Sequence, residues 1–162
     1  MRILALRLAS FRRFSAPVAI EAFDAGLNVL SGPNEFGKST IFQALEAAFL
    51  LRHGISGAVL EGLRPRAGGE PLVEVDFATP EGQWRIRKQF GRGKAAVLTD
   101  LKTMKAVALV AEAEERLASL TGVANDGPGQ AAPGRMGLVW VRQQRALLPP
   151  DPDIDPMTGK PK

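Results

Sequence analysis

The sequence predicts an α/β fold with a mixed sheet, an antiparallel β-meander and few helices, and three observations support this prediction. First, an apolar run at residues 26–30 leads into a glycine-rich segment and then into an apolar-periodic helix. Second, residues 72–99 alternate apolar and polar side chains between glycine and proline turns, which is typical of antiparallel strands. Third, only one further segment, residues 111–121, shows amphipathic helical spacing. The chain has 162 residues, 45% of them hydrophobic, which is enough for one domain with a core.

The N-terminal segment predicts two strands joined by a basic turn. Residues 1–8 predict the first strand, and residues 18–23 predict a partner strand. In the turn, Phe11 and Phe14 flank two arginines, so anchored rings would leave a guanidinium free to meet a phosphate or an adenine face. On these residues alone, a solvated basic turn is slightly favoured.

Residues 32–39, Gly-Pro-Asn-Glu-Phe-Gly-Lys-Ser, match in full the pattern G-x-x-x-x-G-K-S/T. Glycines at both ends let the backbone curl, so that several N–H groups converge on phosphate oxygens at the start of the next helix. Lys38 is placed to reach the outer phosphates, and the Ser39 hydroxyl is placed to ligate magnesium. The alternative is a glycine-rich turn that binds nothing, and the complete motif between a strand and a helix disfavours it. The sequence therefore predicts a nucleotide-binding module.

Residues 39–51 predict a helix that ends before Gly54. Its expected buried stripe consists of Ile41, Phe42, Leu45, Ala48 and Phe49. His53, the only histidine, lies at the helix end remote from the phosphates, where a favourable position in the helix dipole is a simpler interpretation than catalysis. Residues 54–69, rich in glycine, are predicted to form a loop.

The remaining elements follow the same patterns. Residues 72–77 and 84–90 predict a hairpin whose buried face includes Ile86 and Lys88, and residues 95–99 add a third strand. The helix at 111–121 is predicted to bury Ala113, Leu117 and Leu120 and to be closed by Gly122. Leu138-Val-Trp-Val141 predicts a buried strand that runs directly into two glutamines.

Composition limits the class of protein. The absence of cysteine excludes a disulfide framework, a thiolate metal site and a cysteine nucleophile. No run of 18 apolar residues is present, so no membrane partner is expected, and a cytoplasmic location fits. The net charge of +4 leans toward a polyanionic partner, although 21 basic against 17 acidic residues also fit an ordinary soluble surface.

Groups that a nucleotide hydrolase needs are missing from the sequence. A second acidic strand, four apolar residues ending in Asp or Asp-Glu, would hold the magnesium water and polarise the attacking water. Residues 73–76 are the nearest match, but their alternation indicates a half-exposed antiparallel strand. No Leu-Ser-Gly-Gly type signature occurs either. The chain therefore contains part of an active site.

Three motifs together resemble the N-terminal lobe of an ABC-type ATPase head. They are Phe11-Arg12 after an opening strand, residues 26–40, and Val139-Trp-Val-Arg-Gln143. The resemblance covers about residues 1–145 and is to the SMC-like family of chromosome and DNA-repair ATPases, in particular the nuclease-associated SbcC type. It implies a P-loop NTPase fold, with residues 1–148 as the lobe and residues 149–162 as a disordered linker toward a missing coiled coil.

The resemblance also implies the residues that bind Mg-ATP. Arg12 would contact the nucleotide, Lys38 the outer phosphates, and Ser39 with Gln143 the Mg²⁺ ion. Gln143 would sense the terminal phosphate and, with Lys38, serve catalysis; Gln144 competes for this role because the doubled glutamine blurs the register. The phosphate cradle would comprise Asn34, Glu35, Phe36, Gly37, Lys38, Ser39 and Thr40. Weaker candidates to contact the base or ribose are Leu63, Arg64 and Pro65.

The function implied is that of a DNA double-strand-break repair ATPase. Hydrolysis would require the C-terminal lobe and a second head, so the chain alone is expected to be inactive. A metallo-nuclease subunit and DNA would be partners, in a nucleoid-associated location. The alternatives are a nucleotide-dependent clamp or tether without a nuclease, and an unrelated P-loop kinase, disfavoured because no acceptor pocket or lid is recognisable. Arg85 and Arg87 fit either a DNA contact or the solvated face of a hairpin, and the second is slightly favoured.

Overall fold

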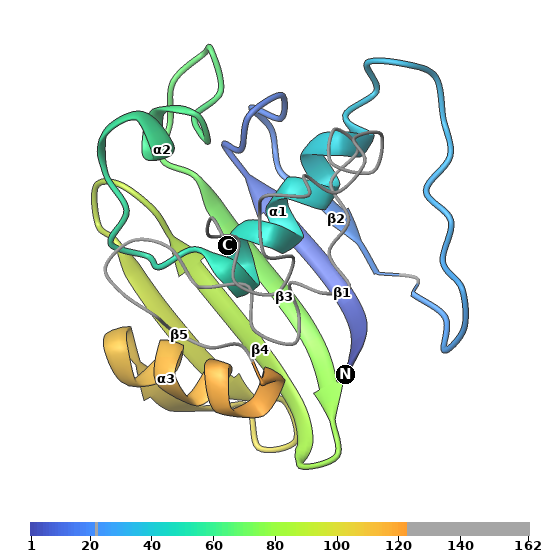
Figure 1. The fold of residues 1–162 in the computed structure, drawn as a ribbon, viewed down its shortest axis with the longest axis vertical. Coiled ribbons are helices and arrows are strands. Elements are labelled where there is room, and N and C mark those ends of the chain that lie inside the picture. Colours follow the sequence, from blue (N-terminus) through green and yellow to red (C-terminus); the bar gives the residue numbers. More distant parts are fainter. Residues whose placement is uncertain (22, 123–162) are drawn as a thin grey trace, which may run out of the picture.

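The computed structural model describes residues 1–21 and 23–122, which form one antiparallel sheet with helices on one face (Figure 1). The strand order is β2-β1-β3-β4-β5-β6. The strands are β1 (Arg2–Ala9), β2 (Val18–Ile20), β3 (Leu72–Thr79), β4 (Gly82–Gln89), β5 (Ala95–Asp100) and β6 (Lys105–Leu109). The helices are α1 (Lys38–Leu50), α2 (Gly57–Glu61) and α3 (Val110–Thr121). The predicted meander is confirmed as β3-β4-β5, but the predicted mixed sheet is wrong for these residues, because every strand pair among them is antiparallel.

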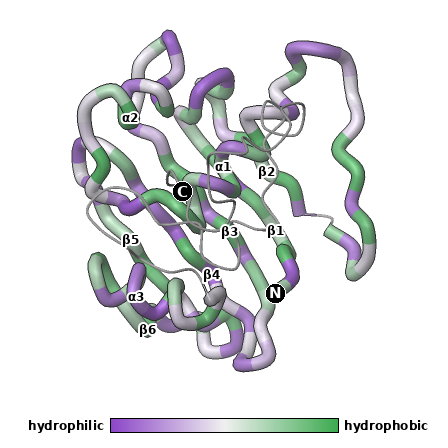
Figure 2. The backbone as a smooth tube through the Cα atoms, viewed as in Figure 1, coloured by the Kyte–Doolittle hydropathy of each residue, from purple (hydrophilic) through white to green (hydrophobic). Residues whose placement is uncertain are grey.

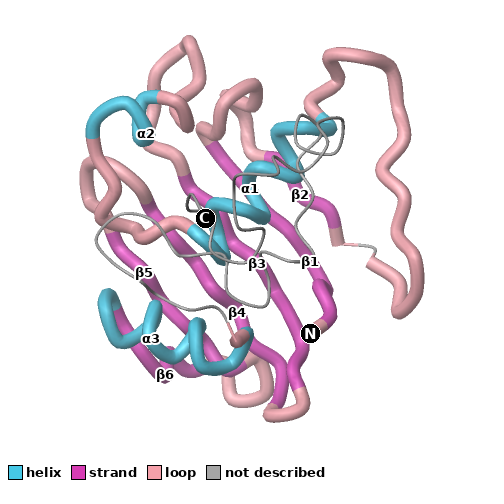
Figure 3. Tube along the Cα trace, in the orientation of Figure 1, coloured by secondary structure: helices cyan, strands magenta, loops and turns pink. Residues whose placement is uncertain are grey.

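The strand predicted at residues 26–30 is absent. This segment belongs to the long connection between β2 and α1, which extends away from the sheet (Figure 3) although it carries hydrophobic residues (Figure 2). Leu27 is 90% exposed and Val29 is 76% exposed. The Asn28 amide bends the chain locally, because its side chain bonds the backbone of Asp24 and Gly26. A strand needs a neighbour for its N–H and C=O groups, and none of the described strands pairs with this segment.

The core lies between the sheet and the helices α1 and α3. Alternate residues of the strands face the helices, and the Phe49 ring of α1 meets the Phe77 ring of β3 edge-on, with centroids 5.5 Å apart. The buried face of α1 consists of Thr40, Ile41, Ala44, Ala47, Ala48 and Phe49. Phe42, predicted to lie in the buried stripe, is instead 37% exposed. Three alanines thus form the middle of the buried stripe, and Ile41 and Phe49 supply its large side chains.

Two elements have no counterpart among the predictions. The short helix α2 lies within residues 54–69, which were predicted to form a loop, and β6 forms one edge of the sheet. The turn from β6 into α3 has no intervening loop, and Val110 takes a φ of 52° there. The predicted face of α3 is confirmed, and so is its end at Gly122, whose φ of 70° suits glycine.

The face of the sheet opposite to α1 and α3 carries a network of ion pairs around Asp76. Its carboxylate accepts hydrogen bonds from Arg85 Nε at 2.6 Å and from Arg7 at 3.0 Å, and Arg7 also pairs with Glu21. Burial raises the pKa of Asp76, but the hydrogen bonds from Arg85 and Arg7 outweigh it and hold the pKa below its usual value. Since Arg85 is neutralised within the protein, this geometry favours its structural interpretation over a DNA contact.

A buried polar cluster joins the end of α1 to β4 and α3. Lys88 Nζ donates to Leu51 O at 2.6 Å and lies 3.7 Å from Glu114 Oε1. The same carboxylate accepts from the His53 backbone N–H at 2.6 Å and lies 3.0 Å from His53 Nδ1. Arg52 Nε is 3.9 Å from Glu114 Oε2. His53 therefore serves a structural contact at this helix end, and Lys88, although charged, is on the buried face as its register predicts.

Lys88 is expected to make stability rise with pH in the alkaline range. Burial lowers its pKa to about 8 from 10.5, although the Glu114 charge partly offsets this effect. Between these two values the unfolded chain binds more protons than the folded one, so the free energy of unfolding increases as pH rises through this window. Urea unfolding from pH 7 to 10.5 checks this: the Lys88→Met variant should lack the rise, and an identical rise in the variant would contradict the assignment.

Candidate nucleotide-binding site

The predicted site residues gather at one end of the sheet. Ala9 at the end of β1 pairs with Leu72 at the start of β3, so the turn after β1 and the connection from α2 to β3 lie together. The N-terminal end of α1 lies at this same end of the molecule (Figure 1). Antiparallel pairing thus brings residues near 12, 38 and 64 into one region, although they are far apart in the chain.

The phosphate loop precedes α1 and is open to solvent along most of its length. Asn34, Glu35 and Phe36 are exposed, and Glu35 adopts a left-handed φ of 67°. Gly37 is buried and has a φ of 90°, a conformation that favours glycine. These turns reverse the chain direction into the helix, and they leave the loop backbone accessible to a ligand.

Lys38 is folded back onto the loop. Its Nζ donates to Gly32 O and to Pro33 O, both at 2.7 Å. Both partners are neutral carbonyls, so no carboxylate of the described residues compensates the positive charge of the amine. Ser39 is exposed and available to a ligand, whereas Thr40 is buried. The arrangement offers one uncompensated ammonium and one hydroxyl beside the loop backbone.

The start of α1 fits a phosphate group. No side chain caps this helix end, and its first turn contains no acidic residue. The first N–H groups of the helix consequently lack side-chain partners, and the helix dipole favours an anion there. These N–H groups and Lys38 would hold the phosphates of a nucleoside triphosphate, and the Ser39 hydroxyl would ligate its Mg²⁺ ion. Bound Mg²⁺ would neutralise the phosphate charge; the residues described supply binding and orientation.

The arginine turn lies against this loop. Phe11 and Phe14 exchange two backbone hydrogen bonds of 2.9 Å, which brings Arg12 and Arg13 to the tip of a tight turn. The Arg12 backbone N–H donates to Leu63 O at 2.7 Å, and its φ is 50°. Neither guanidinium of the turn forms an ion pair within the described part of the chain. Arg12 therefore lies in the same region as the phosphate loop, and its guanidinium has no carboxylate partner among the described residues.

Arg64 reaches the same region, but its side chain is engaged. It donates to both oxygens of Glu70 at 2.9 Å and to Glu61 Oε1 at 2.5 Å. The hydrogen bonds from Arg64 hold the pKa of Glu70 below its usual range. The structure thus places the Arg64 backbone beside Arg12 through Leu63, while two carboxylates compete with any nucleotide for its guanidinium.

Other predicted features lie outside the described residues. These are Gln143, Gln144, the strand at 138–141 and the linker at 149–162. Within the residues described, no group of three or more His, Cys, Asp or Glu side chains is arranged to hold a metal ion. Nor is any helix in this part both long enough and apolar enough to cross a bilayer.

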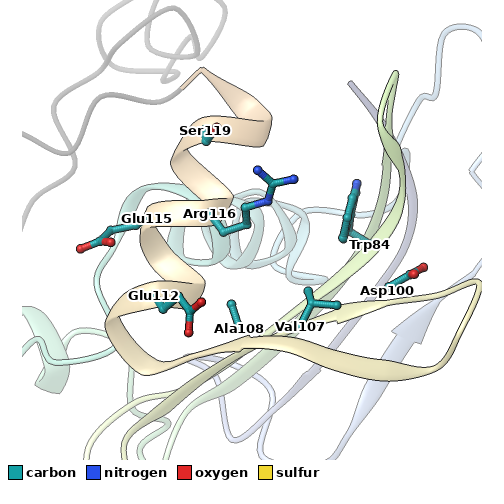
Figure 4. A pocket seen from close by; sticks show the side chains of 8 residues that line it. All are labelled: Trp84, Asp100, Val107, Ala108, Glu112, Glu115, Arg116 and Ser119. Atoms are coloured by element: carbon teal, nitrogen blue, oxygen red, sulfur yellow. The ribbon is translucent and has the colours of Figure 1, made fainter.

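A groove between α3 and the β5–β6 edge is separate from this site (Figure 4). The Arg116 guanidinium lies 6.0 Å from the centre of the Trp84 ring and pairs with Glu81 at 2.9 Å. None of the predicted site residues that the structure describes lines this groove. Sequence reasoning also missed a contact within the site itself, that of the Phe14 ring with Gly37, because only the folded chain brings the two residues together.

The loop geometry, the uncapped helix start and the Lys38 ammonium, which is bonded to loop carbonyls, are those of a nucleotide-binding domain of the phosphate-loop class. A family model described as an AAA domain matches residues 5–116, and the chain belongs to this family. The family is found in SMC-like and SbcC-type proteins, and its members generally act as ATPases that bind ATP with Mg²⁺. A search of curated proteins gives no match to the chain.

Proposed function

We propose that this chain is the Mg-ATP-binding N-terminal half of an SbcC-like ATPase that acts in DNA double-strand-break repair. The observation that carries the proposal is the phosphate loop at the uncapped start of α1, where the partners of Lys38 among the described residues are two neutral carbonyls. An anion is the ligand that completes such a site. The arginine turn adds further positive charge at the same end of the sheet, and its guanidinium groups form no ion pair with the residues that the structure describes.

The finer assignment is supported by the order of the motifs. An aromatic-arginine pair, a phosphate-loop motif and a late apolar segment at residues 138–141 followed by glutamine occur along the sequence in the order found in SMC-like heads. The matched family includes proteins of this type. Neither a second acidic strand nor a signature motif occurs in the sequence. We therefore assign hydrolysis to an assembly in which a C-terminal lobe and a second head supply these groups.

Titration calorimetry of the chain with Mg-ATP tests nucleotide binding. We expect saturable heat, and a thermal shift that corresponds to about 2.7 kcal/mol when the nucleotide is at about 100 times its dissociation constant. The controls are MgCl₂ without nucleotide and ATP with excess chelator. Absence of both heat and thermal shift at millimolar Mg-ATP would overturn the proposal.

Partner capture tests the repair assignment separately. The proposal expects the intact protein to co-purify with a metallo-nuclease and its ATP turnover to exceed that of the chain. A protein that binds Mg-ATP and assembles on DNA without a nuclease would instead support the clamp or tether. The outcome of partner capture does not alter the result of the Mg-ATP titration, so nucleotide binding and the repair assignment are tested independently.

A further inference from the structure

The Phe14 ring packs directly on the last glycine of the phosphate loop. A Cβ atom built on Gly37 would lie 2.4 Å from Phe14 Cζ and 3.0 Å from Cε2. Carbon atoms do not approach so closely, so the ring occupies the space that any side chain at position 37 would need. Gly37 is itself buried, which shows that the contact excludes water at this point.

Phe14 is also tied to the arginine turn. Its backbone N–H and C=O both bond Phe11, whose side chain is fully buried in the core. Arg12 lies between these two residues in the sequence, and its backbone N–H is bonded to Leu63 O. The turn is therefore fixed to the core through Phe11, to the α2–β3 connection through Arg12, and to the phosphate loop through Phe14.

The phosphate loop is exposed along residues 32–36 in the described part of the chain. Phe36 is 70% exposed, and the Lys38 amine bonds carbonyls of the loop itself. The connection that leads into the loop extends away from the sheet (Figure 1). The Phe14 ring joins the loop directly to the arginine turn.

We infer that Phe14 is a positioning residue of the nucleotide site, which sets the separation of Arg12 and Lys38 so that both act on one triphosphate. This inference rests on the proposed nucleotide-binding function and adds a residue to it. A ligand that bridges two charged groups binds more tightly when the groups are held in place before it arrives. Loss of the ring would leave both charges present but would free the loop to move away from the turn.

Mg-ATP titration of two variants tests the inference. Phe14→Ala should bind about tenfold more weakly than the wild type, whereas Phe14→Leu, which still fills the space over Gly37, should stay within about threefold. Ile20→Ala serves as a matched control, because Ile20 is a partly buried hydrophobic residue of β2 that packs on the same core. It should lose stability without losing affinity at a temperature well below its unfolding midpoint.

A double-mutant cycle with Arg12→Ala distinguishes positioning from a general loss of stability. If Phe14 acts through Arg12, the Arg12→Ala change should weaken binding several-fold less in the Phe14→Ala background than in the wild type. Additive effects, or equal losses in Phe14→Ala and Ile20→Ala, would overturn the inference. Wild-type affinity in Phe14→Ala would overturn this inference alone, whereas absence of binding by the wild type would overturn the proposed function as well.

Discussion

Lys38→Ala is expected to weaken Mg-ATP binding at least about 100-fold, because the ammonium supplies the charge-assisted contacts to the outer phosphates. The free energy of unfolding should change by no more than about 0.5 kcal/mol. Among the described residues the amine bonds Gly32 O and Pro33 O, which belong to exposed loop residues, so water replaces the amine after the substitution. Titration calorimetry and urea unfolding measure the two quantities.

Lys102→Ala is the matched control for this prediction. Lys102 is exposed and lies in the β5–β6 turn, at the end of the sheet opposite to the phosphate loop. The substitution changes the net charge by the same amount as Lys38→Ala, so any difference in affinity between the two variants is due to the position of the lysine. Equal affinity of Lys38→Ala and the wild type, or an equal loss in Lys102→Ala, would show that the ligand does not use the loop.

Glu114→Ala is expected to destabilise the fold by about 3 kcal/mol, the cost of removing one partner from a buried ion pair. Glu114 is 6% exposed and Lys88 is 2% exposed, so the change leaves a buried ammonium without its nearest carboxylate. The His53 backbone N–H loses its acceptor at the same time. Urea unfolding at pH 7 provides the measurement.

Glu115→Ala provides the comparison on the same helix, because Glu115 is exposed and should contribute less than about 0.5 kcal/mol. Adding Lys88→Met to Glu114→Ala should recover part of the loss, since a buried ammonium is then replaced by an apolar chain of similar length. A similar small effect for both glutamates would show that the buried cluster does not stabilise the fold.

The features predicted correctly depend on residues that are close in the sequence. Glycine spacing and the Lys-Ser pair define the phosphate loop without reference to any other segment, and the alternation in residues 72–99 specifies the meander. Gly122 marks the end of α3 by a local rule of backbone conformation. Placement of the turn after β1 near α1 follows from strand pairing, which the sequence pattern alone does not specify.

The errors arise where structure depends on distant partners. The apolar run at residues 26–30 has strand propensity, but propensity without a neighbouring strand leaves backbone groups unpaired. Burial of Glu114 depends on Lys88 and His53, which are 26 and 61 residues away in sequence. Glu114 follows Ala113 on α3 and looks like part of the charged face, so no local signal marks it as buried.

The two ends of α1 are held in different ways, which determines how the helix can move. Beyond its C-terminal end, Leu51 O accepts from the buried Lys88 and His53 N–H bonds Glu114, whereas its N-terminal end rests on the Phe14 ring. The helix has 13 residues and is about 20 Å long. Because Ile41 and Ala44 in the N-terminal half of the helix are also buried in the core, the displacement caused by a ligand is expected to be largest in the exposed loop before Lys38 and small along the helix itself.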